Sequence, residues 1–448
     1  MTPSFTLFEK NEPVLESGLK KVLILAYYFP PMGLSGVQRT LKFVKYLPQF
    51  GWKPIVLTIS PTAYYAYDET LLNELEGLPV EIHRTDTRDI TKAAARASGK
   101  REFKMPAENT RRFMSMISQS FFIPDNKIGW NSFAIQKASE IIEKNGDIEV
   151  IFSTAPPFSS HLIALELRRK YQLPTAVEFR DPWVDNPSHF YLTPFHKRKH
   201  AALEETVVLT ADKVVSVNRT LKELLVKKYH GKLKHTDVSI IPHGFDEEDF
   251  QGLDRSYIKG NKFRLTYSGV FRDDRTPVPL FQGLKALIQK RPEIKDFIEL
   301  SFTGIFPNEY FKQSKNAGLD GLITTKGYVS HQEAILENLK ADVLWATLGK
   351  AKNNDCITLG KLFEYVACNR TIFGIMPDGA SALFIREANG FIAAPDKPLE
   401  IAAKLEILFD LWKKGHLPRP SEDTVQKYNR KRLAEQLSKE LGQMITVY

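Results

Sequence analysis

The chain has 448 residues, of which 43% are hydrophobic and 26% are charged. This length predicts about two domains, and the composition is that of a globular protein, which excludes a mainly disordered or fibrous chain. The formal net charge of +9 favours anionic partners, among them nucleotide phosphates, a lipid-linked phosphate, an anionic membrane face and nucleic acid.

The N-terminus and the cysteines indicate a cellular compartment. The first 18 residues include acidic side chains and no long apolar run, so they do not resemble a secretory signal. No segment reaches the ~18 consecutive apolar residues of a membrane span, and we therefore expect a cytoplasmic protein. Cys356 and Cys368 are too few for a disulfide framework and lack the spacing of a zinc site, so we expect free thiols and no bound metal.

The first half of the chain alternates short β-branched runs with helical patterns, which is typical of a parallel sheet covered by helices. An amphipathic stretch is expected at 37–50 and a helix at 159–171. The expected strands lie at 21–28, 54–59, 149–154, 175–180 and 213–217.

The second half repeats this α/β pattern. The expected strands lie at 263–269, 298–304, 322–327, 341–347 and 370–375, with an apolar helical pattern at 400–412. A polar stretch rich in turn formers at 244–262 marks the boundary. We therefore predict an N-terminal Rossmann-like domain at 1–250, a second Rossmann-like domain at 251–423, and one amphipathic helix at 424–448 that completes the first domain.

Gly33 and Gly36 follow the first strand, where a helix is expected to begin. Glycine lets backbone N–H groups approach a ligand closely, and a helix N-terminus favours an anion. A tight turn without a ligand remains the alternative. The glycine pattern is not a full dinucleotide fingerprint, and no acidic residue closes the second strand, which argues against a dinucleotide-dependent oxidoreductase.

Two stretches of the second half predict a phosphate site. Gly269 closes a strand, and Arg272 and Arg275 follow it just before a helix, where guanidinium groups suit paired phosphate oxygens; a solvated charged loop is the alternative. A second helix is expected to begin within Thr358 to Lys361, with Gly360 allowing close backbone approach. Glu364 lies three residues after Lys361, so their side chains share a helix face and could bind different parts of one ligand; a surface ion pair is the alternative.

Residues 88–123 combine basic and apolar side chains. Such a combination is typical of a helix on anionic lipid, although the apolar part could instead pack on the first domain. The basic residues are Arg88, Lys92, Arg96, Lys100, Arg101, Lys104, Arg111 and Arg112, and the apolar ones are Phe113, Met114, Met116, Ile117, Phe121 and Phe122.

Several stretches, in order along nearly the whole chain, carry a family resemblance. They are YYFPPMGLSGVQR, VEFRDPWVDNP, IIPHGF, YSGVFRDDRTP, KGYVSHQEAILENLKADVLW and GKLFEYVACNRTIFGI. On these residues the chain resembles glycosyltransferases of the GT-B fold, in which two Rossmann-like domains face across a cleft, and is similar to glycosyltransferase family 4. The resemblance implies metal-independent transfer, with retention, of a sugar from a nucleotide diphosphate donor to a glycan or lipid-linked acceptor, in polysaccharide or glycoconjugate biosynthesis.

The resemblance also implies roles for individual residues. Glu364 would bind the ribose hydroxyls, while Lys361 and Arg275 would neutralise the diphosphate. The donor-binding set is completed by Gly33, Gly36, Gly269, Arg272, Tyr328, Val329, Thr358 and Gly360, with Tyr328 and Val329 bordering the base. Asp181 would face the cleft; a carboxylate paired with Arg180 is the alternative.

The sequence departs from the family at one position. Related enzymes often carry a second glutamate eight residues before Glu364, where this chain has Cys356 beside Asp355. Asp181 and Asp355 are therefore the candidate catalytic carboxylates. The departure leaves open a catalytically inactive protein that binds nucleotide sugars or glycans, and an epimerase or hydrolase of the same fold. No recognition motif accompanies the basic residues, so we expect no nucleic-acid partner.

Overall fold

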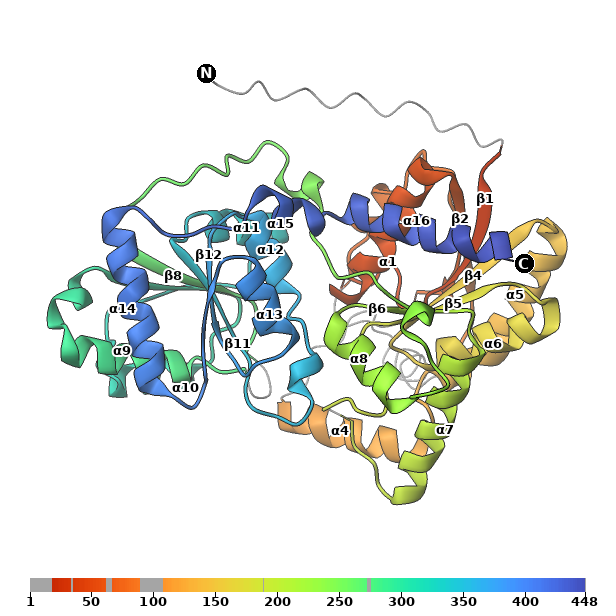
Figure 1. The fold of residues 1–448 in the computed structure, drawn as a ribbon, viewed down its shortest axis with the longest axis horizontal. Coiled ribbons are helices and arrows are strands. Elements are labelled where there is room, and N and C mark those ends of the chain that lie inside the picture. Colours follow the sequence, from red (N-terminus) through yellow and green to blue (C-terminus); the bar gives the residue numbers. More distant parts are fainter. Residues whose placement is uncertain are drawn as a thin grey trace.

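The computed structural model describes residues 18–33, 35–61, 67–88, 108–187, 189–271 and 275–447; for residues 35, 108–113 and 447 only the backbone is described. It contains two parallel sheets, each flanked by helices (Figure 1). The predicted α/β class with two Rossmann-like units is confirmed.

The first sheet has seven parallel strands in the order β3-β2-β1-β4-β5-β6-β7. Val22 of β1 pairs with Pro54 of β2 on one side and with Val150 of β4 on the other, so the strand order reverses between β1 and β4. The strands are β1 (Lys20–Leu25), β2 (Trp52–Ile59), β3 (Glu81–Thr85), β4 (Ile148–Ala155), β5 (Thr175–Phe179), β6 (Lys213–Ser216) and β7 (Val238–Ile240).

Helices cover both faces of this sheet. The expected amphipathic stretch is α1 followed by a 3-10 turn, η1, which ends at Gly51 with a left-handed φ of 84° that favours glycine. The α-helices are α1 (Ser35–Tyr46), α2 (Thr70–Asn73), α4 (Glu108–Phe121), α5 (Asn131–Asn145), α6 (Ser159–Tyr171), α7 (Pro194–Thr210) and α8 (Arg219–Lys228); the 3-10 turns are η1 (Leu47–Phe50), η2 (Ile128–Trp130) and η3 (His235–Asp237).

The second sheet has six parallel strands in the order β10-β9-β8-β11-β12-β13, and its order reverses between β8 and β11. The strands are β8 (Phe263–Ser268), β9 (Ile298–Thr303), β10 (Ile323–Gly327), β11 (Val343–Thr347), β12 (Thr371–Ile375) and β13 (Phe391–Ala393). The helical segments are α9 (Val278–Lys290), η5 (Pro292–Asp296), α10 (Asn308–Asn316), α11 (His331–Leu339), η6 (Asn354–Cys356), α12 (Lys361–Ala367), α13 (Ala380–Glu387) and α14 (Pro398–Lys414).

Two chain segments connect the units. One is the stretch after β7, which includes η4 (Glu247–Phe250); the other is α15 (Glu422–Lys427) followed by α16 (Arg430–Val447). Figure 1 shows α16 lying over the first unit, and Leu433, Leu437 and Leu441 enter the core of that unit. The domain boundaries at 250 and 423 stay predictions.

The expectation of one continuous helix from residue 424 is wrong. Phe245 N–H donates to the carbonyl of Tyr428, and Arg430 N–H donates to the carbonyl of Phe245. Because the backbone at 428–430 bonds to the other connecting segment rather than along a helix, the chain separates into α15 and α16 there. The two connections are thereby joined side by side.

Candidate active site

The loop after β1 and the end of β5 are joined by one guanidinium. Arg180 donates from Nε to the Ala155 carbonyl at 3.1 Å, from Nη2 to the Pro156 carbonyl at 2.7 Å, and from Nη1 to the carbonyl of Gly36 in the first turn of α1. Gly33 lies in the loop just before that helix. Arg180 therefore holds the carboxyl-end loops of β1, β4 and β5 in place.

Asp181 follows Arg180 directly but makes no hydrogen bond with a described residue. Burial raises the pKa of its carboxyl group, while the charges of Arg180 and of Arg275 from the second unit oppose the rise. Because the guanidinium of Arg180 bonds to three carbonyls, the alternative of a simple Asp181–Arg180 pair does not describe this site. The charge of Arg275 in the second unit thus acts on Asp181 at the carboxyl end of the first sheet.

Lys361 is the first residue of α12, and its side-chain amine lies in an unusual environment. The Nζ atom is buried and has no hydrogen-bond acceptor among the described residues, and it lies 3.4 Å from the centroid of the Tyr267 ring. Burial lowers the pKa of Lys361 well below its ordinary value; Arg275 adds to this effect and Glu364 opposes it. A buried amine without a partner is costly, and strongly perturbed groups of this kind cluster at functional sites.

Gly269 provides the space for this ammonium group. It follows β8 with a φ of 121°, and a Cβ atom at this position would lie 3.1 Å from the Nζ of Lys361. Only glycine adopts that backbone conformation readily. The end of β8 and the start of α12 therefore form one compact element around the cation.

Glu364 lies one turn into α12 and makes no ion pair with Lys361. Burial raises the pKa of its carboxyl group, and the charges of His331 and Arg430 oppose the rise more than that of Lys361 does. His331 Nε2 lies 3.4 Å from a carboxylate oxygen of Asp249 in η4. Arg430 Nε donates to the Gly244 carbonyl at 2.9 Å. Glu364 is thus electrostatically linked to both connections between the units.

Two further predicted residues lie at the edge of the second sheet. Tyr328 and Val329 follow β10, the edge strand, and precede α11. The Tyr328 side chain is 84% exposed, so its ring offers a free face to an aromatic ligand. Arg272 lies outside the described residues.

Hydrogen bonds across the two units involve residues that the sequence did not single out. Asn218 donates from Nδ2 to the Cys356 carbonyl at 2.8 Å and to Thr358 Oγ1 at 3.1 Å, while its Oδ1 caps α8 by accepting from Leu221 N–H. Asn353 Nδ2 donates to the Asp185 carbonyl at 2.7 Å. The strand-Asn-helix pattern could have revealed the helix cap, but no local signal shows the partner in the other unit.

Asp355 and Cys356, where a family glutamate is often found, lie in η6. The Asp355 side chain is exposed, whereas Cys356 is buried and its pKa is raised to about 12 by burial, Asp355 and Asp185. Cys356 is therefore a thiol at neutral pH and cannot replace a carboxylate. Gly360 directly precedes α12, and a Cβ atom at this position would meet no other atom within 4 Å.

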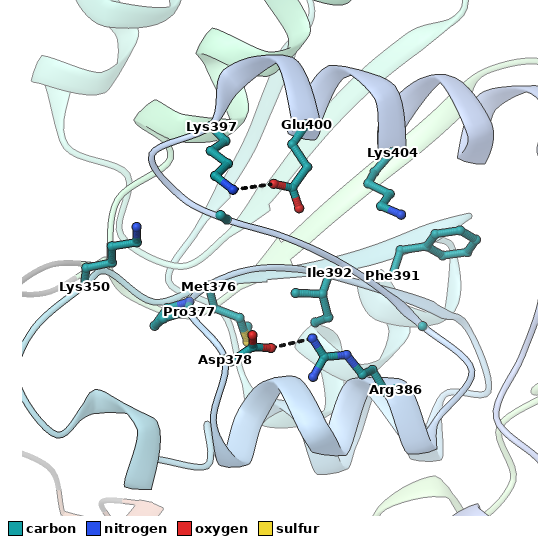
Figure 2. Close-up of a pocket in the computed structure, with 12 residues that line it drawn as sticks. Lys350, Met376, Pro377, Asp378, Arg386, Phe391, Ile392, Lys397, Glu400 and Lys404 are labelled. Carbon is teal, nitrogen blue, oxygen red and sulfur yellow. Dashed lines mark hydrogen bonds and ion pairs between the residues drawn. The ribbon is translucent and has the colours of Figure 1, made fainter.

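A cavity in the second unit lies away from these residues. It has a volume of about 530 Å³ and lies between α13 and α14 beside the edge strand β13 (Figure 2). Its charged groups largely pair with one another: Arg386 with Asp378, and Lys397 with Glu400 at 3.8 Å. None of the predicted site residues lines it.

No described group of three or more His, Cys, Asp or Glu side chains is arranged to hold a metal ion. Metal independence stays a prediction. Within the same described residues, no helix has the length and apolar character needed to cross a membrane.

The sequence profile of Glycosyltransferase Family 4 matches residues 36–249, from the first turn of α1 to η4. This segment of the chain is similar to Glycosyltransferase Family 4. The prediction of a GT-B glycosyltransferase similar to that family is confirmed. No curated protein sequence matches the chain significantly.

Solved glycosyltransferase structures share the fold of this chain over nearly its whole length. The structure of a glycosyltransferase from Rickettsia africae aligns with 95% of this chain and 98% of its own chain, at 14% sequence identity and a TM-score of 0.61. The structure of Anabaena HepE in complex with UDP and glucose aligns with 95% of this chain and 100% of its own chain, at 12% sequence identity and a TM-score of 0.59. The structure of sucrose-phosphate synthase from Thermosynechococcus elongatus aligns with 96% of this chain and 100% of its own chain, at 14% sequence identity and a TM-score of 0.60. At these identities the likeness establishes the fold.

Proposed function

We propose that this glycosyltransferase moves a sugar from a nucleotide diphosphate donor to a glycan or lipid-linked acceptor, in the assembly of a polysaccharide or glycoconjugate. The observation that carries the proposal is the buried Nζ of Lys361, which has no acceptor among the described residues and lies beside Gly269. A diphosphate would supply the missing acceptor. The solved complex of Anabaena HepE with UDP and glucose has the same fold, which supports a nucleotide sugar as the donor.

The charges suit the reaction. When the bond between the sugar and the diphosphate breaks, negative charge develops on the departing phosphate and positive charge at the anomeric carbon. Lys361 and Arg275 would stabilise the departing diphosphate, and one preorganised contact of this kind is worth about 3 kcal/mol of barrier. In this proposal Glu364 binds the ribose hydroxyls, and Tyr328 and Val329 border the base.

The first domain would supply the acceptor side. Asp181 is electrostatically coupled to Arg275, and its raised pKa suits a group that exchanges a proton with an acceptor hydroxyl.

Asp355 is exposed on η6, across the domain interface from Asp185, and is the second candidate carboxylate. Retention of configuration stays a prediction that depends on the family resemblance.

Thermal unfolding against a panel of nucleoside diphosphates and nucleotide sugars tests the donor site. A ligand at a hundredfold excess over its dissociation constant should stabilise the protein by about 2.7 kcal/mol. We expect one diphosphate family to stabilise the wild type and Glu364→Ala to weaken the effect. A folded wild type that responds to no nucleotide would contradict the donor site.

Product analysis distinguishes transfer from the alternatives. Release of the nucleoside diphosphate that depends on an added acceptor supports transfer. Hydrolysis or epimerisation without acceptor indicates a different enzyme of the same fold, and nucleotide binding without turnover of any donor indicates an inactive binding protein.

A further inference from the structure

Two helices that are distant in sequence lie side by side at one end of the first domain. Figure 1 shows α4 next to the beginning of α7. The backbone N–H of Phe190 donates to Gln119 Oε1 at 2.6 Å, and His196 Nε2 lies 3.2 Å from the carbonyl oxygen of Ser120. These contacts fix the end of α4 against the segment that leads into α7.

This junction exposes apolar side chains that a globular surface normally covers. Met114, Ile117 and Phe121 lie three and four residues apart on α4, so they occupy one face of that helix. Phe121 is 79% exposed and Phe195 is 61% exposed. We define the α4–α7 patch as Met114, Ile117, Phe121, Leu192 and Phe195, all of which are exposed. The apolar part of α4 therefore does not pack fully on the first domain.

The charged residues of the two segments that carry the patch have one sign. Lys197, Arg198 and Lys199 are exposed on the first turns of α7, and Lys199 Nζ lies 5.2 Å from the centroid of the Phe195 ring. Residues 109–124 and 186–203 contain no Asp or Glu. Exposed aromatic groups beside cations are typical of a surface that enters the headgroup region of an anionic bilayer.

A second copy of the chain is a poorer partner for this surface. A two-fold symmetric dimer would place the same patch on both sides of the contact. The cations of α7 would then face like charges, which oppose association. An anionic lipid surface accepts the aromatic groups and neutralises the cations at once.

We propose that the α4–α7 patch docks the enzyme on an anionic lipid bilayer. Part of the patch continues from the loop that contains Asp181: Leu192 lies in that loop between β5 and α7, and Phe195 lies in the first turn of α7. Docking would therefore bring a lipid-linked acceptor to the carboxyl end of β5. This role rests on the proposed function, because it identifies the source of the acceptor, whereas binding to lipid can be measured without any substrate.

Co-sedimentation of the full chain with phosphatidylglycerol vesicles and with phosphatidylcholine vesicles tests the proposal. We expect the wild type to prefer phosphatidylglycerol and to bind less as salt increases. The double variant Phe121→Ser/Phe195→Ser should bind about tenfold more weakly or worse. The matched control is Ile258→Ser/Leu399→Ser, whose side chains are 85% and 79% exposed outside the patch, and it should bind like the wild type.

Three results would overturn the docking proposal: no binding of the wild type to phosphatidylglycerol, equal binding of the double variant and the wild type, or equal loss in the control. A concentration-dependent dimer in light scattering that the double variant abolishes would also overturn it, in favour of a second copy. Thermal stabilisation by the nucleoside diphosphate should be unchanged in the double variant. If that stabilisation is absent in every form while lipid binding persists, the proposed donor function fails and the docking surface stands.

Discussion

Replacing Lys361 by methionine should make the unliganded enzyme more stable while damaging its donor site. A buried polar group without a partner costs about 1–3 kcal/mol, and more if charged. The contact of Nζ with the Tyr267 ring returns about 0.5–2 kcal/mol. Because methionine keeps most of the apolar stem, we expect Lys361→Met to increase the free energy of unfolding by roughly 1 kcal/mol at neutral pH.

The gain in stability should depend on pH in a defined direction. Burial lowers the pKa of Lys361 in the folded protein below its value in the unfolded chain. Between these two pKa values the unfolded chain binds a proton that the folded protein does not, so wild-type stability rises with pH there. The advantage of Lys361→Met is therefore largest below the lowered pKa and shrinks as pH rises through it towards the ordinary lysine value.

Urea unfolding at several pH values, with and without the stabilising nucleoside diphosphate, measures both effects. The lost charged contact, worth about 1.5–3 kcal/mol, should weaken nucleotide binding by roughly 10- to 100-fold. Lys285→Met, on the exposed side of α9, is the matched control and should change neither quantity. A Lys361→Met variant that is less stable than the wild type and keeps its nucleotide affinity would refute this reasoning.

Three further substitutions test other parts of the structure. Asn218→Ala removes a helix cap and two hydrogen bonds to the second domain, so the free energy of unfolding should fall by about 1 kcal/mol or more and turnover should fall. An unchanged melting temperature in thermal unfolding would contradict this contact. Glu178→Ala leaves the buried Arg39 guanidinium without its carboxylate, which lies 2.7 Å away, and urea unfolding should show a loss of about 3–5 kcal/mol; a loss below 1 kcal/mol would show that the pair is not needed. Tyr328→Ala should leave stability within about 0.5 kcal/mol, because the side chain is exposed, yet weaken nucleotide binding by about 1–3 kcal/mol in calorimetric titration if the ring stacks on the base; an unchanged dissociation constant would remove Tyr328 from the donor site.

The central strands were predictable because most of their residues are buried on both faces. Runs such as KVLIL and EVIFST are continuous and β-branched, as expected for central parallel strands. Three of the four edge strands escaped the pattern. β3 (Glu81–Thr85) is polar and mostly half-buried, while β7 (Val238–Ile240) and β13 (Phe391–Ala393) have only three residues each. Edge strands bury less surface, so their apolar signal is weaker.

The candidate site was predictable where local sequence determines it. The turn at Gly269 and the spacing of Lys361 and Glu364 can be seen in single segments. The hydrogen bonds of Asn218 to η6 and the coupling of Glu364 to Arg430 join residues far apart in the chain. No periodicity or spacing encodes such contacts, since they depend on how the two domains meet.

A crystal structure of the enzyme with its stabilising nucleoside diphosphate tests the central claim most directly. The proposal predicts the diphosphate within hydrogen-bond distance of Lys361 Nζ and Arg275, with the ribose hydroxyls on Glu364. A nucleotide bound elsewhere, for example in the cavity between α13 and α14, with Lys361 still lacking an acceptor, would contradict the proposed donor site.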